Sequence, residues 1–258
     1  MYFVNRAEAG KKLAKEFADF DGKNCAVIAL SDGGAMIGSQ IAEALHCVLM
    51  MLLTEPIELP GEPEPFAVIN QDGGFTYNSL YSAGQLEELD MDYHHYIEEK
   101  KVDKLHQMHH LLGREGLIEK DLLSGHTVIL ASDGLSSGFS LDAAIDYLKT
   151  IKVEKIVVAV PFATIQAVDR MHILADEIHC LDVIDNYIST NHYYESNAIP
   201  KHIEIVEMIE KIVRLAEQKR KADITDKKVV RPKAKDAPKK LRTARVPEEG
   251  VLMVPHDG

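Results

Sequence analysis

A run of serine, glycine and aspartate residues in the middle of the chain has the types and spacing needed to hold a sugar phosphate. Residues 132–140 read SDGLSSGFS and follow the apolar run of residues 128–131. A glycine-rich turn and a helix N-terminus present unpaired backbone N–H groups to an anion, and serine hydroxyls add further donors. The predicted phosphate-binding residues are Ser132, Gly134, Leu135, Ser136, Ser137, Gly138 and Ser140.

Asp133, near the start of this run, decides between two interpretations of it. An ordinary strand-to-helix turn would contain the same serines, because serine is a common helix cap. A carboxylate beside a phosphate-binding turn suits the hydroxyls of a sugar phosphate, and Asp133 stands at that place. Asp133 therefore favours a sugar-phosphate site over a plain turn.

The elements on either side of the run position it. Residues 128–131 (VILA) are too few for a helix and are rich enough in β-branched residues for a buried strand. From residue 139 onward, the spacing of Leu141, Ile145 and Leu148 predicts a helix with one apolar face. The run therefore lies between the end of a strand and the start of a helix.

A second strand–glycine–helix unit comes earlier in the chain. Its predicted strand covers residues 25–30, and its helix continues through Ile37, Ile41 and Leu45. The loop between them consists of Ser31, Asp32, Gly33 and Gly34. On its own this loop favours a tight turn in which glycine supplies a positive φ, rather than an anion site.

Continuous apolar runs, rather than alternating ones, indicate a parallel sheet. Such runs occur at residues 25–30, 46–53, 128–131 and 155–161, with helical patterns between them. Helices cover both faces of a parallel sheet. The sequence predicts an α/β domain over residues 1–218, three layers thick, with a mostly parallel central sheet.

The pattern changes between residues 55 and 112. Residues 55–64 are rich in proline and glycine and predict a surface connection. Two β-prone pieces around an Asp-Gly-Gly turn, residues 66–70 and 75–78, predict a hairpin. Residues 81–90 are polar and contain glycine, as any loop can, and residues 92–112 predict a long helix.

Charge and composition exclude several classes of protein. The formal net charge of −12 argues against a general nucleic-acid binder. No apolar run approaches the roughly 20 residues of a membrane span, and three widely spaced cysteines are typical of a reduced, cytoplasmic protein. Residues 219–258 are basic and predict a flexible, solvated tail, in preference to one that binds nucleic acid.

The mid-chain run resembles the phosphoribosyl-diphosphate (PRPP) motif of the type I phosphoribosyltransferases. In that family an apolar strand leads into two acidic residues and then a loop of the form Gly-x-x-Thr-Gly-x-Thr. Here Ser132 replaces the first acid and Asp133 is the second. Ser137 and Ser140 replace the two threonines, so the hydroxyl groups are kept.

The earlier glycine loop resembles the pyrophosphate loop of one branch of this family, in which the strand ends in Leu-Pro-Arg-Gly-Gly. This chain has Leu30-Ser31-Asp32-Gly33-Gly34, so Asp32 replaces the basic residue. A carboxylate repels a pyrophosphate unless Mg²⁺ lies between them. Either this loop recruits a metal ion, or this half of the site has changed its ligand.

The resemblance implies a Mg²⁺-dependent enzyme that transfers the phosphoribosyl group of PRPP to a nitrogen nucleophile, usually of a nucleobase, and releases pyrophosphate. Asp133 would be the catalytic residue, and Asp133 and Asp32 would be the metal ligands. The resemblance also implies a mobile segment at residues 81–90 that closes over the substrate. It further implies a hood at residues 1–5 and 183–194 that selects a small-molecule acceptor, and dimers are common in the family. The changes at Ser132 and Asp32 leave a second interpretation open: a catalytically degenerate relative that binds a nucleoside monophosphate or ribose phosphate in a regulatory role.

Overall fold

The chain is built around a five-stranded parallel sheet. The computed structural model describes residues 2–18, 20, 24–112, 118 and 120–229. The strands are β1 (Cys25–Ala29), β2 (Val48–Met51), β6 (Thr127–Ala131), β7 (Lys155–Val160) and β9 (Glu177–Cys180), in the order β2-β1-β6-β7-β9. All neighbouring pairs are parallel, and every residue of β1, β2 and β6 is buried. The apolar runs therefore mark strands covered on both faces, and the predicted α/β fold class is confirmed.

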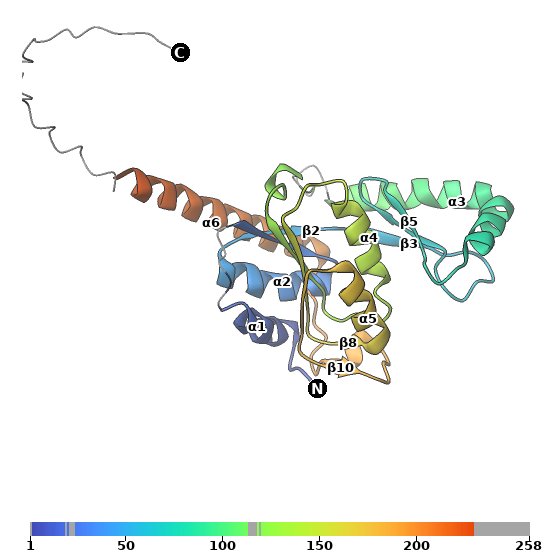
Figure 1. Cartoon of the computed structure of the whole chain (residues 1–258), viewed down its shortest axis with the longest axis horizontal. Coiled ribbons are helices and arrows are strands. Elements are labelled where there is room, and N and C mark those ends of the chain that lie inside the picture. Colours follow the sequence, from blue (N-terminus) through green and yellow to red (C-terminus); the bar gives the residue numbers. More distant parts are fainter. Residues whose placement is uncertain (1, 19, 21–23, 113–117, 119, 230–258) are drawn as a thin grey trace, which may run out of the picture.

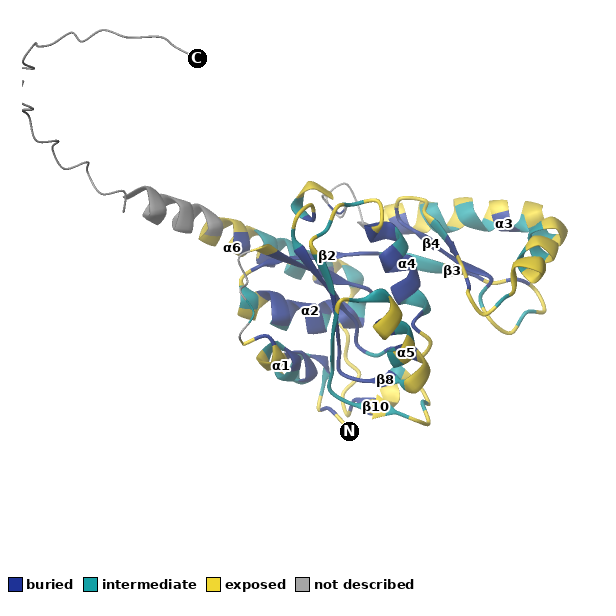
Figure 2. Cartoon of the chain, viewed as in Figure 1, coloured by how far each residue is buried: buried dark blue, intermediate teal, exposed yellow. Residues whose placement is uncertain are grey.

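Helices cover both faces of this sheet (Figures 1 and 2). One layer holds α1 (Arg6–Glu16), α2 (Asp32–Leu45) and the first turns of α6 (His202–Val229), and the other holds α4 (Phe139–Leu148) and α5 (Ile165–Leu174). Val27 of β1 packs in the core of the first layer with Leu13, whereas the next residue, Ile28, packs in that of the second with Leu141. Alternate strand residues thus face opposite layers, as a pleated strand requires.

A smaller antiparallel sheet with its own apolar core projects from the central domain (Figure 1). Its strands are β3 (Thr54–Ile57), β4 (Ala67–Asn70) and β5 (Phe75–Tyr77), in that order, and α3 (Ala83–Leu112) packs against them. β4 and β5 confirm the predicted hairpin. The prediction of a plain surface connection at residues 55–64 is wrong at its start, because β3 pairs there with β4. Pro56 is tolerated because β3 is an edge strand of this sheet.

The predicted helix of residues 92–112 is preceded by a further helical segment, and α3 kinks between the two at Tyr93, whose φ and ψ are −112° and 15°. Most of residues 81–90, expected to be mobile, belong to α3, which begins at Ala83. The Ser82 and Gln85 side chains hydrogen-bond to each other's backbone N–H groups, and this capping box starts the helix. α6 continues to Val229, past the predicted boundary at residue 218, while residues 230–258 of the predicted tail lie outside the described residues. None of the described helices has the length and apolarity that crossing a membrane requires.

Residues 2–5 and 183–197 lie together, and this group, called the hood below, includes the predicted hood residues 183–194. The short parallel strands β8 (Ala163–Thr164) and β10 (Val183–Ile184) are followed by the 3₁₀ turn Thr190–Tyr193. The Phe3 N–H donates to the Tyr193 carbonyl, and the Glu195 N–H donates to the Phe3 carbonyl. The ring of Phe162 lies 4.7 Å from that of Tyr193 and fixes the hood to the end of β7.

Candidate functional site

The predicted phosphate-binding loop connects β6 to α4 as expected. Gly138 is the N-cap of α4, with φ +77°, and it offers no side chain to the first backbone N–H groups of the helix. Asn5, Ser31 and Thr164, by contrast, cap α1, α2 and α5 with side-chain oxygens. The Gly138 carbonyl accepts from the Leu141 N–H at 3.0 Å, and Ser137 Oγ accepts from the Phe139 N–H at 3.4 Å. The start of α4 therefore combines a positive helix dipole with an N-cap residue that has no side chain, and the nearest hydroxyl comes from the loop.

Not every predicted loop residue faces outward. Ser136 and Ser137 are exposed, whereas Ser132 is buried and its hydroxyl donates to the Gly134 carbonyl. Leu135 is 3% exposed and forms a β-bridge with Ala163, so it anchors the loop in the core. Gly134 is required for close packing, because a Cβ atom there would lie 2.6 Å from Cε2 of Phe162. Ser132 and Leu135 thus shape the loop, and Ser136 and Ser137 are available to a ligand.

Asp133 is held by a residue that the sequence analysis did not identify. Arg6 Nε lies 2.7 Å from Asp133 Oδ2, and the Ser31 hydroxyl donates to Oδ1 at 3.0 Å. Tyr194 donates its hydroxyl to the Asp133 backbone carbonyl at 2.7 Å. Arg6 and Asp133 are 127 positions apart, and no local pattern in the sequence points from one to the other.

The predicted loop of residues 31–34 is instead the first turn of α2. Ser31 is the N-cap, Asp32 begins the helix, and neither Gly33 nor Gly34 has a positive φ. The interpretation as a tight turn with positive φ is therefore wrong. The glycines are needed because the chain passes close to β6: a Cβ atom on Gly34 would lie 2.7 Å from the Ala131 carbonyl oxygen, and one on Gly33 would lie 2.0 Å from Asp133 Oδ2.

Asp32 is directed to a different partner. Its Oδ1 lies 2.8 Å from Nδ1 of His202, the first residue of α6. The Asp32 side chain keeps 35% of its surface exposed, so its carboxylate can still meet a ligand or ion from solvent. Within the described ranges no group of three or more His, Cys, Asp or Glu residues could hold a metal ion. Asp32 and Asp133 are therefore not part of such a group of three, and their role as metal ligands stays a prediction.

Two tyrosines of the hood lie within the field of Asp133. Burial, reinforced by the Asp133 charge, raises the pKa of Tyr194. Burial also raises the pKa of Tyr187, and the Asp133 charge acts in the same direction. The rise in pKa keeps both hydroxyls protonated further into the alkaline range than an ordinary tyrosine, and Tyr194 donates to the Asp133 carbonyl.

The chain matches no family model. A curated protein of Mycobacterium tuberculosis, which carries the name "Putative phosphoribosyl transferase" in each of two strains, is 26% identical over 214 residues, or 82% of this chain and 47% of the relative. The chain thus spans about half the length of the curated relatives it matches. The crystal structure of TT1426 from Thermus thermophilus has a TM-score of 0.67 and 23% identity, covering 81% of this chain and 98% of that chain. A purine phosphoribosyltransferase from Pyrococcus horikoshii aligns with a TM-score of 0.42 and 10% identity, over 77% and 95%.

The chain is thus similar in sequence to a curated protein named as a phosphoribosyl transferase, and it shares the fold of TT1426. In this chain the two predicted loops meet at Asp133, through the Ser31 hydroxyl on one side and the turn into α4 on the other. Both loops follow the carboxyl ends of neighbouring parallel strands, β1 and β6, which is where ligands bind in open α/β sheets.

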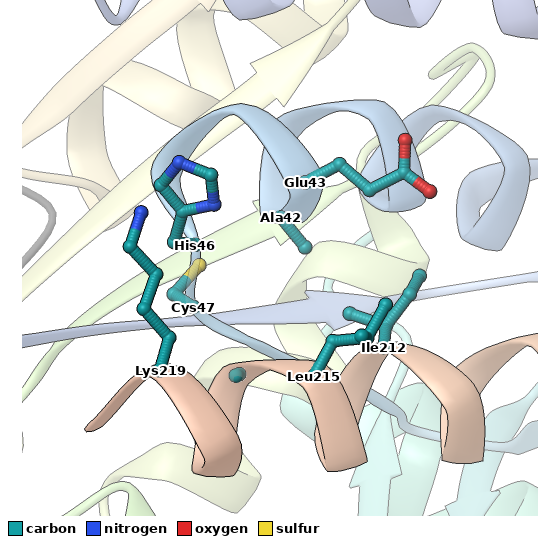
Figure 3. A pocket seen from close by; sticks show the side chains of 8 residues that line it. Ala42, Glu43, His46, Cys47, Ile212, Leu215 and Lys219 are labelled. Carbon is teal, nitrogen blue, oxygen red and sulfur yellow. The ribbon is translucent and has the colours of Figure 1, made fainter. Parts of the chain in front are cut away.

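A cavity of about 400 Å³ is lined by Ser136 and Ser137 of the loop, by α4 and α5, and by residues beside β4 and β5. Asp142 and Arg170 pair in its wall, and burial raises the pKa of Asp142. Another cavity, of about 100 Å³, lies where α6 crosses the end of α2 and is lined by none of the predicted site residues (Figure 3).

Proposed function

We propose that the protein is a phosphoribosyltransferase, which binds the 5-phosphate of PRPP at the start of α4 and passes the phosphoribosyl group to a nitrogen nucleophile. The observation that carries this proposal is the N-terminus of α4, which Gly138 leaves without a side-chain cap at the carboxyl end of the central strand β6. Backbone N–H groups in that position bind phosphate. The named relatives from Mycobacterium tuberculosis support the same reaction class.

In this reaction the bond between the anomeric carbon and the diphosphate oxygen breaks, and a bond from that carbon to the acceptor nitrogen forms. The diphosphate leaves with the bonding electron pair, and the sugar passes through a state with positive charge at the anomeric carbon. Asp133 accepts hydrogen bonds from the ribose hydroxyls. Because Arg6 offsets much of its charge, Asp133 acts chiefly as an oriented acceptor and less as a counter-charge.

Mg²⁺ fits this site as an ion that arrives with the diphosphate. Mg²⁺ commonly binds through one or two carboxylates together with substrate phosphates. Asp32 has a partly exposed carboxylate at the start of α2, whereas both Asp133 oxygens already have protein partners. Asp32 would thus hold the metal, which would neutralise the leaving diphosphate.

A second function, binding of a nucleoside monophosphate or ribose phosphate without turnover, is favoured by one specific observation. Ser31 caps α2 with its own hydroxyl, and Asp32 puts a negative charge at the same helix start. Both features oppose a free diphosphate there. At the start of α4, by contrast, the N-cap residue has no side chain, and Asp142 in the first turn is paired with Arg170. This function would need the 5-phosphate half of the site alone.

Isothermal titration with PRPP and with nucleoside monophosphates, each with and without Mg²⁺, separates the two functions. The transferase predicts PRPP binding that strengthens with Mg²⁺, and pyrophosphate release when an acceptor is added. Monophosphate binding that ignores Mg²⁺, with no pyrophosphate released from a panel of nucleobases, would instead identify a binding protein.

Gly138→Ala tests the phosphate-binding turn directly. The left-handed φ of +77° costs an alanine about 1–2 kcal/mol, and the new Cβ would lie 3.2 Å from Cβ and Cγ of Arg170. We expect lower stability in urea and weaker binding of inorganic phosphate by titration calorimetry. Gly125→Ala is the matched control, because Gly125 has φ +70° and open space around it. It should lose similar stability and keep its phosphate affinity; equal affinity in both variants would argue against the site.

A further inference from the structure

Arg6 is a buried charged residue that makes more directed contacts than an ion pair needs. Its residue surface is 2% exposed. Besides Nε to Asp133, its Nη2 donates to Asn191 Oδ1 at 2.7 Å and its Nη1 donates to Asn197 Oδ1 at 3.4 Å. The guanidinium therefore connects the loop after β6 with the hood through separate nitrogen atoms.

The arrangement depends on the shape of an arginine side chain. A guanidinium is a planar fork with five donors, whereas a lysine ammonium is a single point of charge. The Arg6 guanidinium also lies 4.5 Å from the ring centre of Tyr194, whose hydroxyl binds the backbone carbonyl of Asp133. The same assembly thus fixes both the side chain and the main chain of Asp133.

Stability alone does not account for this pair. The loss of hydration of two buried charges offsets much of their attraction, so a buried ion pair is weak evidence of net stabilisation. The ion pair nevertheless requires glycine at position 33, because a Cβ atom there would lie 2.0 Å from Asp133 Oδ2 and 2.7 Å from Arg6 Nε. The more specific result of the arrangement is a carboxylate held in one orientation.

We propose that Arg6 is a positioning residue for the ribose: it holds Asp133 so that the free lone pairs of its carboxylate accept the ribose hydroxyls, and it makes that orientation depend on the hood. Oδ2 has Arg6 and Oδ1 has Ser31 as a partner, and each oxygen can accept one further hydrogen bond. The inference rests on the proposed ribose-phosphate site. It adds that the orientation of Asp133, and with it the recognition of ribose, depends on residues of α1 and the hood that do not contact the ribose.

The test compares ribose 5-phosphate with 2-deoxyribose 5-phosphate and inorganic phosphate in titration calorimetry. A hydrogen bond from a ribose hydroxyl to an ionised carboxylate gives the full chain a preference for ribose over deoxyribose on the order of tenfold to hundredfold. Arg6→Lys keeps the charge and loses the fork. In this variant we expect the preference for ribose over deoxyribose to fall to within about threefold, because the hydrogen bond between the ribose hydroxyl and Asp133 is lost. The affinity for inorganic phosphate should not change. Arg214→Lys, at an exposed arginine of α6, is the matched control and should leave the preference unchanged.

Asn191→Ala gives an independent route to the same result. It removes the acceptor of Nη2 and should lower the ribose preference in the same direction, and its effect should not add to that of Arg6→Lys, because both act through one guanidinium. An unchanged ribose preference in both variants overturns the inference while leaving the ribose-phosphate site intact. A native chain that binds phosphate without any ribose preference overturns the role of Asp133 itself.

Discussion

Gly33→Ala is expected to destabilise the protein by about 3 kcal/mol, although alanine is normally the better helix residue. Gly33 lies in the first turn of α2 with a backbone that alanine can adopt, so strain in φ is not the cause. The cause is contact: the new Cβ would lie 2.0 Å from Asp133 Oδ2 and 2.7 Å from Arg6 Nε. Neither group can move away without separating a buried charge pair.

Urea unfolding of Gly33→Ala measures this effect, and Gly84→Ala provides its matched control. Gly84 also lies in the first turn of a helix, α3, and nothing lies within 4 Å of a Cβ atom built on it. Gly84→Ala should therefore stabilise by about 0.5–1 kcal/mol. The two substitutions should change stability in opposite directions, with a fall in Tm of roughly 6–12 °C for Gly33→Ala. A rise in stability in both variants would contradict the contact at Gly33.

The sheet and the turn into α4 were predictable because their signals are local. Continuous burial along β1 and β6 and the apolar spacing of α4 are properties of short windows, and the structure repeats them. The start of α3 was also encoded, in the Ser82 and Gln85 capping box, but glycine at position 84 made the segment resemble a loop. That error came from weighing composition above a specific pair of residues.

The polar partners of the site were not predictable in the same way. Arg6 meets Asp133 across 127 positions and His202 meets Asp32 across 170, and only the folded chain brings either pair together. The glycine pair at positions 33 and 34 was ambiguous for another reason. Glycine serves either a positive φ or a close approach of another group, and the second use shows only when the neighbouring strand is in place.

Asp133→Asn should lower the free energy of unfolding by about 3–5 kcal/mol, the range for breaking a buried ion pair on one side. Asparagine has nearly the same volume and can still accept one hydrogen bond from Arg6, so packing is preserved. The lost quantity is the negative charge, and Arg6 is left at 2% exposure without it. Urea denaturation at neutral pH measures the loss. Asp146→Asn is the matched control, since Asp146 pairs with Lys149 at the exposed side of α4 and should contribute less than about 1 kcal/mol.

A double substitution separates the cost of the unpaired charge from the value of the pair. Arg6→Met/Asp133→Asn removes both charges, so no buried cation remains to be solvated. We expect this variant to recover at least half of the stability lost by Asp133→Asn, because most of the single-variant effect is the uncompensated guanidinium. The alternative result is that the stability lost by the double variant equals the sum of the losses of Arg6→Met and Asp133→Asn measured singly. It would show that the contacts of Arg6 with Asn191, Asn197 and Tyr194 stabilise the fold by themselves. The double variant could also recover stability and lose the preference for ribose 5-phosphate over 2-deoxyribose 5-phosphate. That result would mean that the fold does not need the ion pair and that ribose recognition does.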